Sequence, residues 1–137
     1  MTTMLFERVG AVVVLVHGRE DPSDPEWDAY VAFATAALHG GAAPSGLLVT
    51  SLGGSPNAGQ RKAIVAVADK QPVTTCVCTD SLIARGVVTA IRWLRAEPMH
   101  ALPLHDLKGA LRLLRVPTDK QDAVIAVVQR LQAELPP

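Results

Sequence analysis

The stretch that decides the fold is Val9-Gly10-Ala11-Val12-Val13-Val14-Leu15-Val16. Its residues are apolar and mostly β-branched, without the alternation of apolar and polar positions that a strand with one face in water would show. We therefore expect one strand over residues 9–16 that is covered on both faces. Residues 4–8 either extend this strand or pair with it.

A helix is predicted directly after the polar loop of residues 17–24. Ser23 or Asp24 can cap it, and Glu26 completes a Ser-x-x-Glu capping box. Apolar residues then recur at the three- and four-residue spacing of a single helix face, at Trp27, Val31, Ala34 and Leu38. The glycine pair 40–41 provides the stop.

The same strand-to-helix alternation continues along the chain. Residues 46–52 and 73–79 are predicted strands, each followed by a helix, and residues 99–104 form a short strand that Pro103 places at a sheet edge. Each of these two helices has an apolar side, which we expect at Ala63, Ile64, Val67 and Ala68 in the first and at Leu82, Ile83, Val87, Ala90, Ile91 and Leu94 in the second.

Two helices are predicted after the last strand. Asp106 can cap a short helix that reaches residue 114 and stops before Pro117. Thr118-x-x-Gln121 resembles a second capping box and opens the final helix, whose apolar stripe is Val124, Val127, Val128, Leu131 and Leu135. This stripe can pack within the chain or against a second copy, so a homodimer is an open alternative.

Strands alternating with helices predict one α/β domain over residues 1–137, with a mostly parallel sheet of four to five strands flanked by about five helices. The chain has 137 residues, equal numbers of basic and acidic side chains (13 each), and 49% hydrophobic residues. Zero net charge argues against extended nucleic-acid contacts, and the hydrophobic fraction argues against disorder. With neither a signal peptide nor a membrane span indicated, we expect a cytoplasmic protein.

The loops that leave the strand ends are the expected binding edge of such a sheet, here residues 17–24, 53–57 and 79–81. Within the second loop, the amides of Gly53, Gly54 and Ser55, with Asn57 and Arg61 close by, could hold a phosphate or carboxylate. The simpler interpretation is that Ser55 caps the next helix and Pro56 starts it. Ser55 is also a candidate phosphorylation site.

Asp80 and Ser81 stand where the third predicted strand meets its helix. A phosphate on Ser81 would be stabilised by the helix dipole, so this serine is the main candidate for a phosphorylation switch, although a plain cap also explains the pair. Arg85 lies one turn further on. With the arginines 92, 95, 112 and 115 it could form a positive patch that recognises acidic partners, or simply a solvated face.

No catalytic constellation or cofactor motif is present in the sequence. G-x-S-x-G is absent, and a low-activity enzyme using Ser55 or His17 remains only a third alternative. Cys76 and Cys78 fall on one face of a strand and could offer two thiolates, but no histidine stands at zinc-site spacing. We therefore expect buried cysteines that pack, with no metal and no cofactor.

Three stretches give the chain its likeness to a known family. They are Pro25-Glu26-Trp27-Asp28-Ala29-Tyr30, Gly53-Gly54-Ser55-Pro56-Asn57, and Thr79-Asp80-Ser81-x-x-x-Arg85-Gly86-Val87-Val88-Thr89-Ala90. In the order of its strands and helices the chain resembles the bacterial STAS-like domains. These include anti-sigma-factor antagonists, non-catalytic proteins whose serine at a strand-to-helix junction is phosphorylated by a partner kinase. The family's Asp-Ser-Ser/Thr-Gly stretch maps onto residues 80–83, where only Asp80 and Ser81 match.

The resemblance implies a non-catalytic regulatory domain that binds another protein, controlled by phosphorylation at Ser81. Ser55 remains a second candidate for phosphorylation from its own place at a strand-to-helix junction. A similar broad fold occurs in CRAL-TRIO lipid-transfer domains, which would imply an apolar ligand. The alternative function is therefore a binder of a small anionic or lipid-like molecule that uses the loop of Gly53, Gly54 and Ser55.

Overall fold

The chain begins with a β-hairpin in the computed structural model, which describes residues 1–42, 44–70, 73–92 and 99–137, without the side chains of residues 68–70. Strand β1 (Met4–Val9) pairs antiparallel with β2 (Val12–His17). The prediction of one strand over residues 9–16 is therefore wrong at its start, because Gly10 turns the chain with φ +58°, a left-handed conformation that favours glycine. The alternative that residues 4–8 pair with this strand is confirmed.

Five strands among the described residues form one sheet in the order β1-β2-β3-β4-β5. Strands β3 (Gly46–Ser51), β4 (Thr74–Thr79) and β5 (Met99–Leu102) all run parallel to β2. The predicted fold class, α/β with a mostly parallel sheet, is confirmed. So is the placement of the last strand at a sheet edge.

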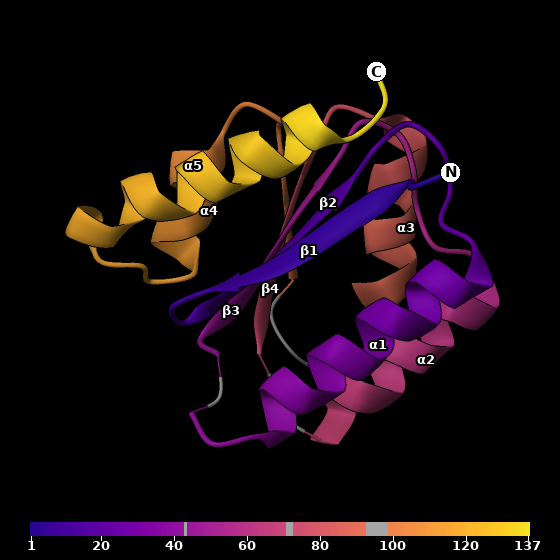
Figure 1. Cartoon of the computed structure of the whole chain (residues 1–137), viewed down its shortest axis with the longest axis horizontal. Helices are drawn as coiled ribbons and strands as arrows, with labels where there is room; N and C mark the ends of the chain where they lie inside the picture. The colour runs from indigo at the N-terminus through magenta and orange to yellow at the C-terminus, as the bar shows by residue number, and fades with distance from the viewer. Residues whose placement is uncertain (43, 71–72, 93–98) are drawn as a thin grey trace.

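Helices cover both faces of this sheet (Figure 1). On one face lie α1 (Asp24–His39), α2 (Ala58–Lys70) and α3 (Leu82–Arg92), the three connections between parallel strands. On the other lie α4 (Leu107–Leu113) and α5 (Thr118–Glu134). No helix in the described part of the chain is long and apolar enough to cross a membrane.

Strand β2 supplies side chains to the cores on both faces of the sheet. Val12, Val14 and Val16 pack with α4 and α5, whereas Val13 and Leu15 pack with α1. All five are at most 2% exposed. The apolar run of the sequence is thus explained by a strand buried on both sides, and the apolar stripe of α5 is buried against its own chain.

Several predicted helix boundaries are confirmed in atomic detail. Ser23 Oγ accepts from the Glu26 amide at 3.3 Å, and the Glu26 carboxylate accepts from the Ser23 amide, which closes the capping box. Gly40 is the C-cap of α1. Asp106 caps α4 by accepting from the Gly109 amide at 3.0 Å.

Other predicted helix boundaries are wrong. Thr118 and Gln121 form no capping box, since Pro117 occupies the N-cap position of α5 and Gln121 donates to the Val116 carbonyl.

The predicted end of the short helix is confirmed, since Leu114 is the C-cap of α4 and Arg115 then takes up a left-handed conformation with φ +59°. In α2, the predicted apolar side is confirmed for Ile64 and Val67, which pack against the core, and is wrong for Ala63, which is exposed. Val65, which the prediction left out, is buried, and the side chain of Ala68 lies outside the described residues.

Candidate functional site

The loops at the carboxyl ends of the parallel strands are joined by hydrogen bonds. The amide of Gly54 donates to the Gly18 carbonyl at 2.9 Å, and the amide of Ser55 donates to Asp21 Oδ1 at 3.0 Å. From the next strand, Thr79 Oγ1 donates to the Ser51 carbonyl at 2.9 Å. The structure therefore gathers the predicted loops at one edge of the sheet.

The glycine loop uses its own amides within the protein. Gly53 donates to Ser51 Oγ at 3.0 Å, and the amides of Gly54 and Ser55 are engaged as described above. Arg61 Nη1 donates to the Pro56 carbonyl at 3.0 Å. An anion at this loop would have to displace these acceptors, so the arrangement gives the proposed phosphate or carboxylate site no support.

Asn57, rather than Ser55, caps helix α2. Its Oδ1 accepts from the Gln60 amide at 2.9 Å, while Gln60 Oε1 accepts from the Asn57 amide at 2.9 Å, a reciprocal capping pair. The predicted cap at Ser55 is wrong because Ser55 and Pro56 lie before the helix begins at Ala58. Ser55 is buried, at 9% exposure, which makes it a poor substrate for a kinase in the folded protein.

Ser81 caps helix α3, as one of the two interpretations of the sequence predicts. Its Oγ accepts from the Ala84 amide at 3.2 Å, and its own amide donates to Thr79 Oγ1 at 3.1 Å. Around it, Asp80 Oδ1 accepts from the Leu104 amide, and Arg85 Nε donates to the Thr79 carbonyl. Ser81 is partly exposed, so its hydroxyl combines access to solvent with a place at a helix N-terminus.

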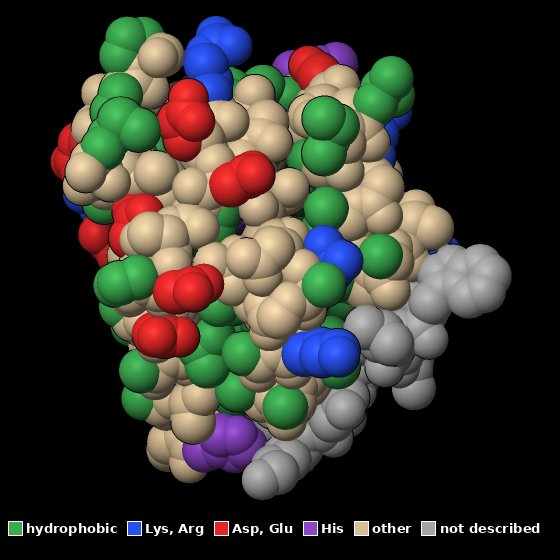
Figure 2. Space-filling view, turned by 90° about the vertical axis from the view of Figure 1, so that its right-hand side faces the viewer, with side chains coloured by type: hydrophobic (Ala, Val, Ile, Leu, Met, Phe, Trp, Pro, Cys, Tyr) green, Lys and Arg blue, Asp and Glu red, His purple; other side chains and the backbone are tan. Residues whose placement is uncertain are grey.

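Leu82 and Ile83 protrude into solvent from the first turn of α3. They are 83% and 76% exposed, whereas the buried face of the helix is Ala84, Val88 and Ile91. The predicted apolar side is therefore wrong for these two residues, and Leu94 lies outside the described residues. Figure 2 shows the face of the molecule that carries α1, α2 and α3, where acidic side chains gather on the left.

The arginines that the sequence suggested as one patch are divided between the two sides of the sheet. Arg85 and Arg92 belong to α3, whereas Arg112 belongs to α4 and Arg115 follows it. Since α3 and α4 cover opposite faces of the sheet, no single helix face carries them all. Arg95 lies outside the described residues.

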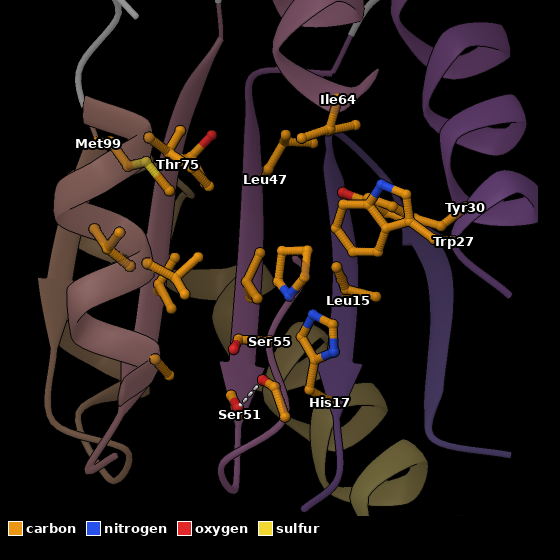
Figure 3. A pocket seen from close by; sticks show the side chains of 18 residues that line it. Leu15, His17, Trp27, Tyr30, Leu47, Ser51, Ser55, Ile64, Thr75 and Met99 are labelled. Carbon is orange, nitrogen blue, oxygen red and sulfur yellow. Dashed lines mark hydrogen bonds between the residues drawn. The ribbon is translucent and has the colours of Figure 1, made fainter. Parts of the chain in front are cut away.

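A cavity of about 70 Å³ lies under the helices α1, α2 and α3 (Figure 3). His17, at the carboxyl end of β2, lines it and is only 3% exposed. The His17 ring stacks on Trp27, with centroids 6.1 Å apart and an angle of 18° between the planes. Burial lowers the pKa of His17 to about 4, although Asp21 and Glu26 act in the opposite direction, and the imidazole is neutral at pH 7.

No local pattern in the sequence predicts this cavity. Its wall combines side chains of β2, β3, β4 and all three helices on that face, which lie far apart along the chain. His17 and Ser55 both line it, yet no hydrogen bond joins them and no carboxylate bonds to the imidazole in the described part of the chain. His17 and Ser55, the residues of the third alternative, a low-activity enzyme, thus line the same cavity. They lack the hydrogen bond that joins a nucleophile to its base.

Cys76 and Cys78 are fully buried in the core beneath α4, on one face of β4 as predicted. Burial raises the pKa of the Cys76 thiol to about 11 and that of Cys78 to about 12, so both are protonated at neutral pH. Within the described residues, no group of three or more His, Cys, Asp or Glu side chains is placed to hold a metal ion.

Neither a protein-family model, nor a curated protein, nor a solved structure matches this chain. Its function is therefore inferred from the geometry and chemistry of the chain itself.

Proposed function

We propose that this chain is a non-catalytic regulatory domain that binds another protein through the first turn of α3. The observation that carries the proposal is the exposure of Leu82 and Ile83, two large apolar side chains in succession at the strand-end edge. A single exposed leucine is common on protein surfaces, but an adjacent pair is a candidate interface. Burying each in a partner would contribute roughly 1.5–3 kcal/mol.

Ser81 is suited to control this contact. A phosphate on its hydroxyl would add nearly two negative charges at the N-terminus of α3, where the helix dipole favours them. Arg85, four residues on, is its neighbour on the helix surface and a counter-charge. The modified domain would remain stable on its own, whereas docking of Leu82 would have to desolvate the adjacent phosphate. Phosphorylation is thus proposed to release the partner.

The likeness to STAS-like domains is consistent with this proposal. We also propose a cytoplasmic location, because two free cysteines persist in a reducing compartment. The proposal assigns no cofactor. The apolar face of α5 packs on β1 and β2, so a homodimer would need another surface.

Affinity capture tests the proposed function. The tagged chain is incubated with a lysate of the organism that encodes it, and captured proteins are quantified by mass spectrometry. Leu82→Asp with Ile83→Asp should reduce the capture of one specific protein at least tenfold. The matched control is Leu113→Asp, which changes a 43% exposed leucine on α4, on the opposite face of the sheet.

The phosphorylation step has its own comparison. Ser81→Asp should weaken capture of the same protein, while Ser81→Ala should retain it. A capture profile that is the same for wild type, the double variant and the α4 control would contradict the proposed interface. Equal capture by Ser81→Asp and Ser81→Ala would contradict control by phosphorylation of Ser81, but not the proposed interface.

A further inference from the structure

His17 lines the cavity, and Figure 3 shows the ring nitrogen farther from its backbone pointing into it. The other ring nitrogen, Nδ1, is buried and has no hydrogen-bond partner among the described residues. A neutral imidazole carries one donor and one acceptor, and buried polar atoms in proteins nearly always have partners. The ring nitrogen that faces the cavity can therefore form a hydrogen bond with a bound molecule.

The cavity carries more polar side chains at one end than at the other (Figure 3). His17, Ser51 and Ser55 lie together at the carboxyl end of the strands. Leu47, Ile64 and Met99 lie at the opposite end, where Thr75 is the polar residue beside Met99. No charged side chain occurs among the described residues that line it. The wall thus favours an uncharged and largely apolar molecule whose polar group lies at the His17 end.

The geometry points to a binding site for a small uncharged alcohol, with its hydroxyl at His17 and its hydrocarbon chain toward Leu47 and Met99. A hydroxyl both donates and accepts, so it suits either tautomer of the imidazole. The volume of about 70 Å³ is roughly half that of an engineered cavity of about 150 Å³ that binds benzene. The site therefore takes only a short chain of a few carbon atoms.

This site is separate from the proposed protein interface. Ala84 lines the cavity from beneath α3, while Leu82 and Ile83 project from the same helix into solvent. Either site can exist without the other, and their tests are independent.

The test titrates the full chain, labelled with ¹⁵N at its histidines, with 1-butanol and separately with butyrate. The imidazole resonances of His17 are assigned with the His17→Gln variant. We expect 1-butanol to shift the His17 resonances along a saturable curve. Butyrate has the same number of carbons but carries a charge, and at equal concentration it should produce no saturable shift.

Two variants locate the binding. Ala84→Leu adds bulk inside the cavity and should weaken 1-butanol binding at least tenfold, whereas Ala126→Leu adds the same bulk to the exposed face of α5 and should leave it unchanged. A linear, unsaturable response to 1-butanol, an equal response to butyrate, or unchanged binding in Ala84→Leu would overturn the proposal. If Ala84→Leu does not fold, the wild-type comparison of the two ligands still decides.

Discussion

Gly54 lies against the carbonyl oxygen of Glu20 so closely that a β-carbon on Gly54 would collide with it. The amide of Gly54 also donates to the Gly18 carbonyl, so Gly54 joins the strand-end loop of residues 53–57 to that of residues 17–24. Gly54→Ala should therefore destabilise the protein by about 1–3 kcal/mol, measured by urea denaturation. Gly86→Ala is the control, because a β-carbon on Gly86, in the exposed part of α3, meets nothing within 4 Å. It should stabilise the protein by about 0.5–1 kcal/mol. Equal effects of the two substitutions would contradict the close packing of these loops.

Burial of His17 predicts a loss of stability in mild acid. The pKa of its imidazole is about 4 in the folded protein, against the ordinary value of 6.5 that applies to the unfolded chain, so between these values the unfolded state binds more protons. The contribution of His17 to the free energy of unfolding is therefore complete above pH 6.5. It falls by about 3 kcal/mol in all as the pH drops toward 4. Partial burial of Glu26 raises the pKa of its carboxyl, but hydrogen bonds from Thr3 and Ser23 together outweigh this and lower it. The effect of Glu26 on stability therefore lies at lower pH, below its ordinary pKa of 4.5.

Urea denaturation between pH 7 and pH 4 measures this dependence. His17→Gln should flatten it over that interval, whereas His105→Gln, which removes an exposed histidine, should keep the wild-type slope. An unchanged slope in His17→Gln would show that this histidine is not buried in its neutral form.

The cap that Ser81 provides to α3 predicts different effects for two substitutions. Ser81→Ala leaves the Ala84 amide without its acceptor and should cost about 1 kcal/mol in the free energy of unfolding. Ser81→Asp keeps a capping oxygen and should stay within about 0.5 kcal/mol of wild type. Thermal denaturation of both variants checks this. A strongly destabilised Ser81→Asp would mean that the aspartate does not replace the cap. Weaker capture of the partner protein by Ser81→Asp could then not be assigned to the added charge.

Replacing Leu82 and Ile83 together with Asp should leave the stability of the protein unchanged within about 0.5 kcal/mol, since neither side chain packs in the core. The first turn of α3 carries no acidic residue, so the new charges also suit the helix dipole. Urea denaturation of the double variant provides the measurement. A loss of several kcal/mol would show that these residues are buried in the protein in solution.

Cys76 and Cys78 should be unreactive toward a thiol reagent at pH 8 in the folded protein, because burial keeps both thiols protonated and covered. In denaturant, both should react fully within minutes. Absorbance of the released chromophore follows the reaction. Rapid modification of either thiol without denaturant would contradict the placement of β4 beneath α4.

The fold could be predicted from the sequence because its strongest signals are local. The apolar run of β2, the capping box at Ser23 and Glu26, and the cap at Asp106 each depend on a few neighbouring residues. The position of the hairpin turn at Gly10 could not be predicted, because its neighbours Val9 and Ala11 are both apolar and continue the run of β2.

The candidate site was harder to predict, for a physical reason. Helix α3 has apolar residues on more than one side, so spacing alone did not separate buried Ala84 and Val88 from exposed Leu82 and Ile83. The cavity beside His17 depends on how three helices rest on the sheet, a relation between residues far apart in the chain.

The most direct test of the proposed interface is photo-crosslinking in living cells. A photoactivatable phenylalanine analogue is placed at position 83, or at position 113 as the control, and crosslinked products are identified by mass spectrometry. The proposal predicts one specific protein crosslinked from position 83 and not from position 113, with a lower yield when Ser81 is replaced by Asp. The same products from both positions, or none from position 83, would contradict the claim that Ile83 lies in a protein interface.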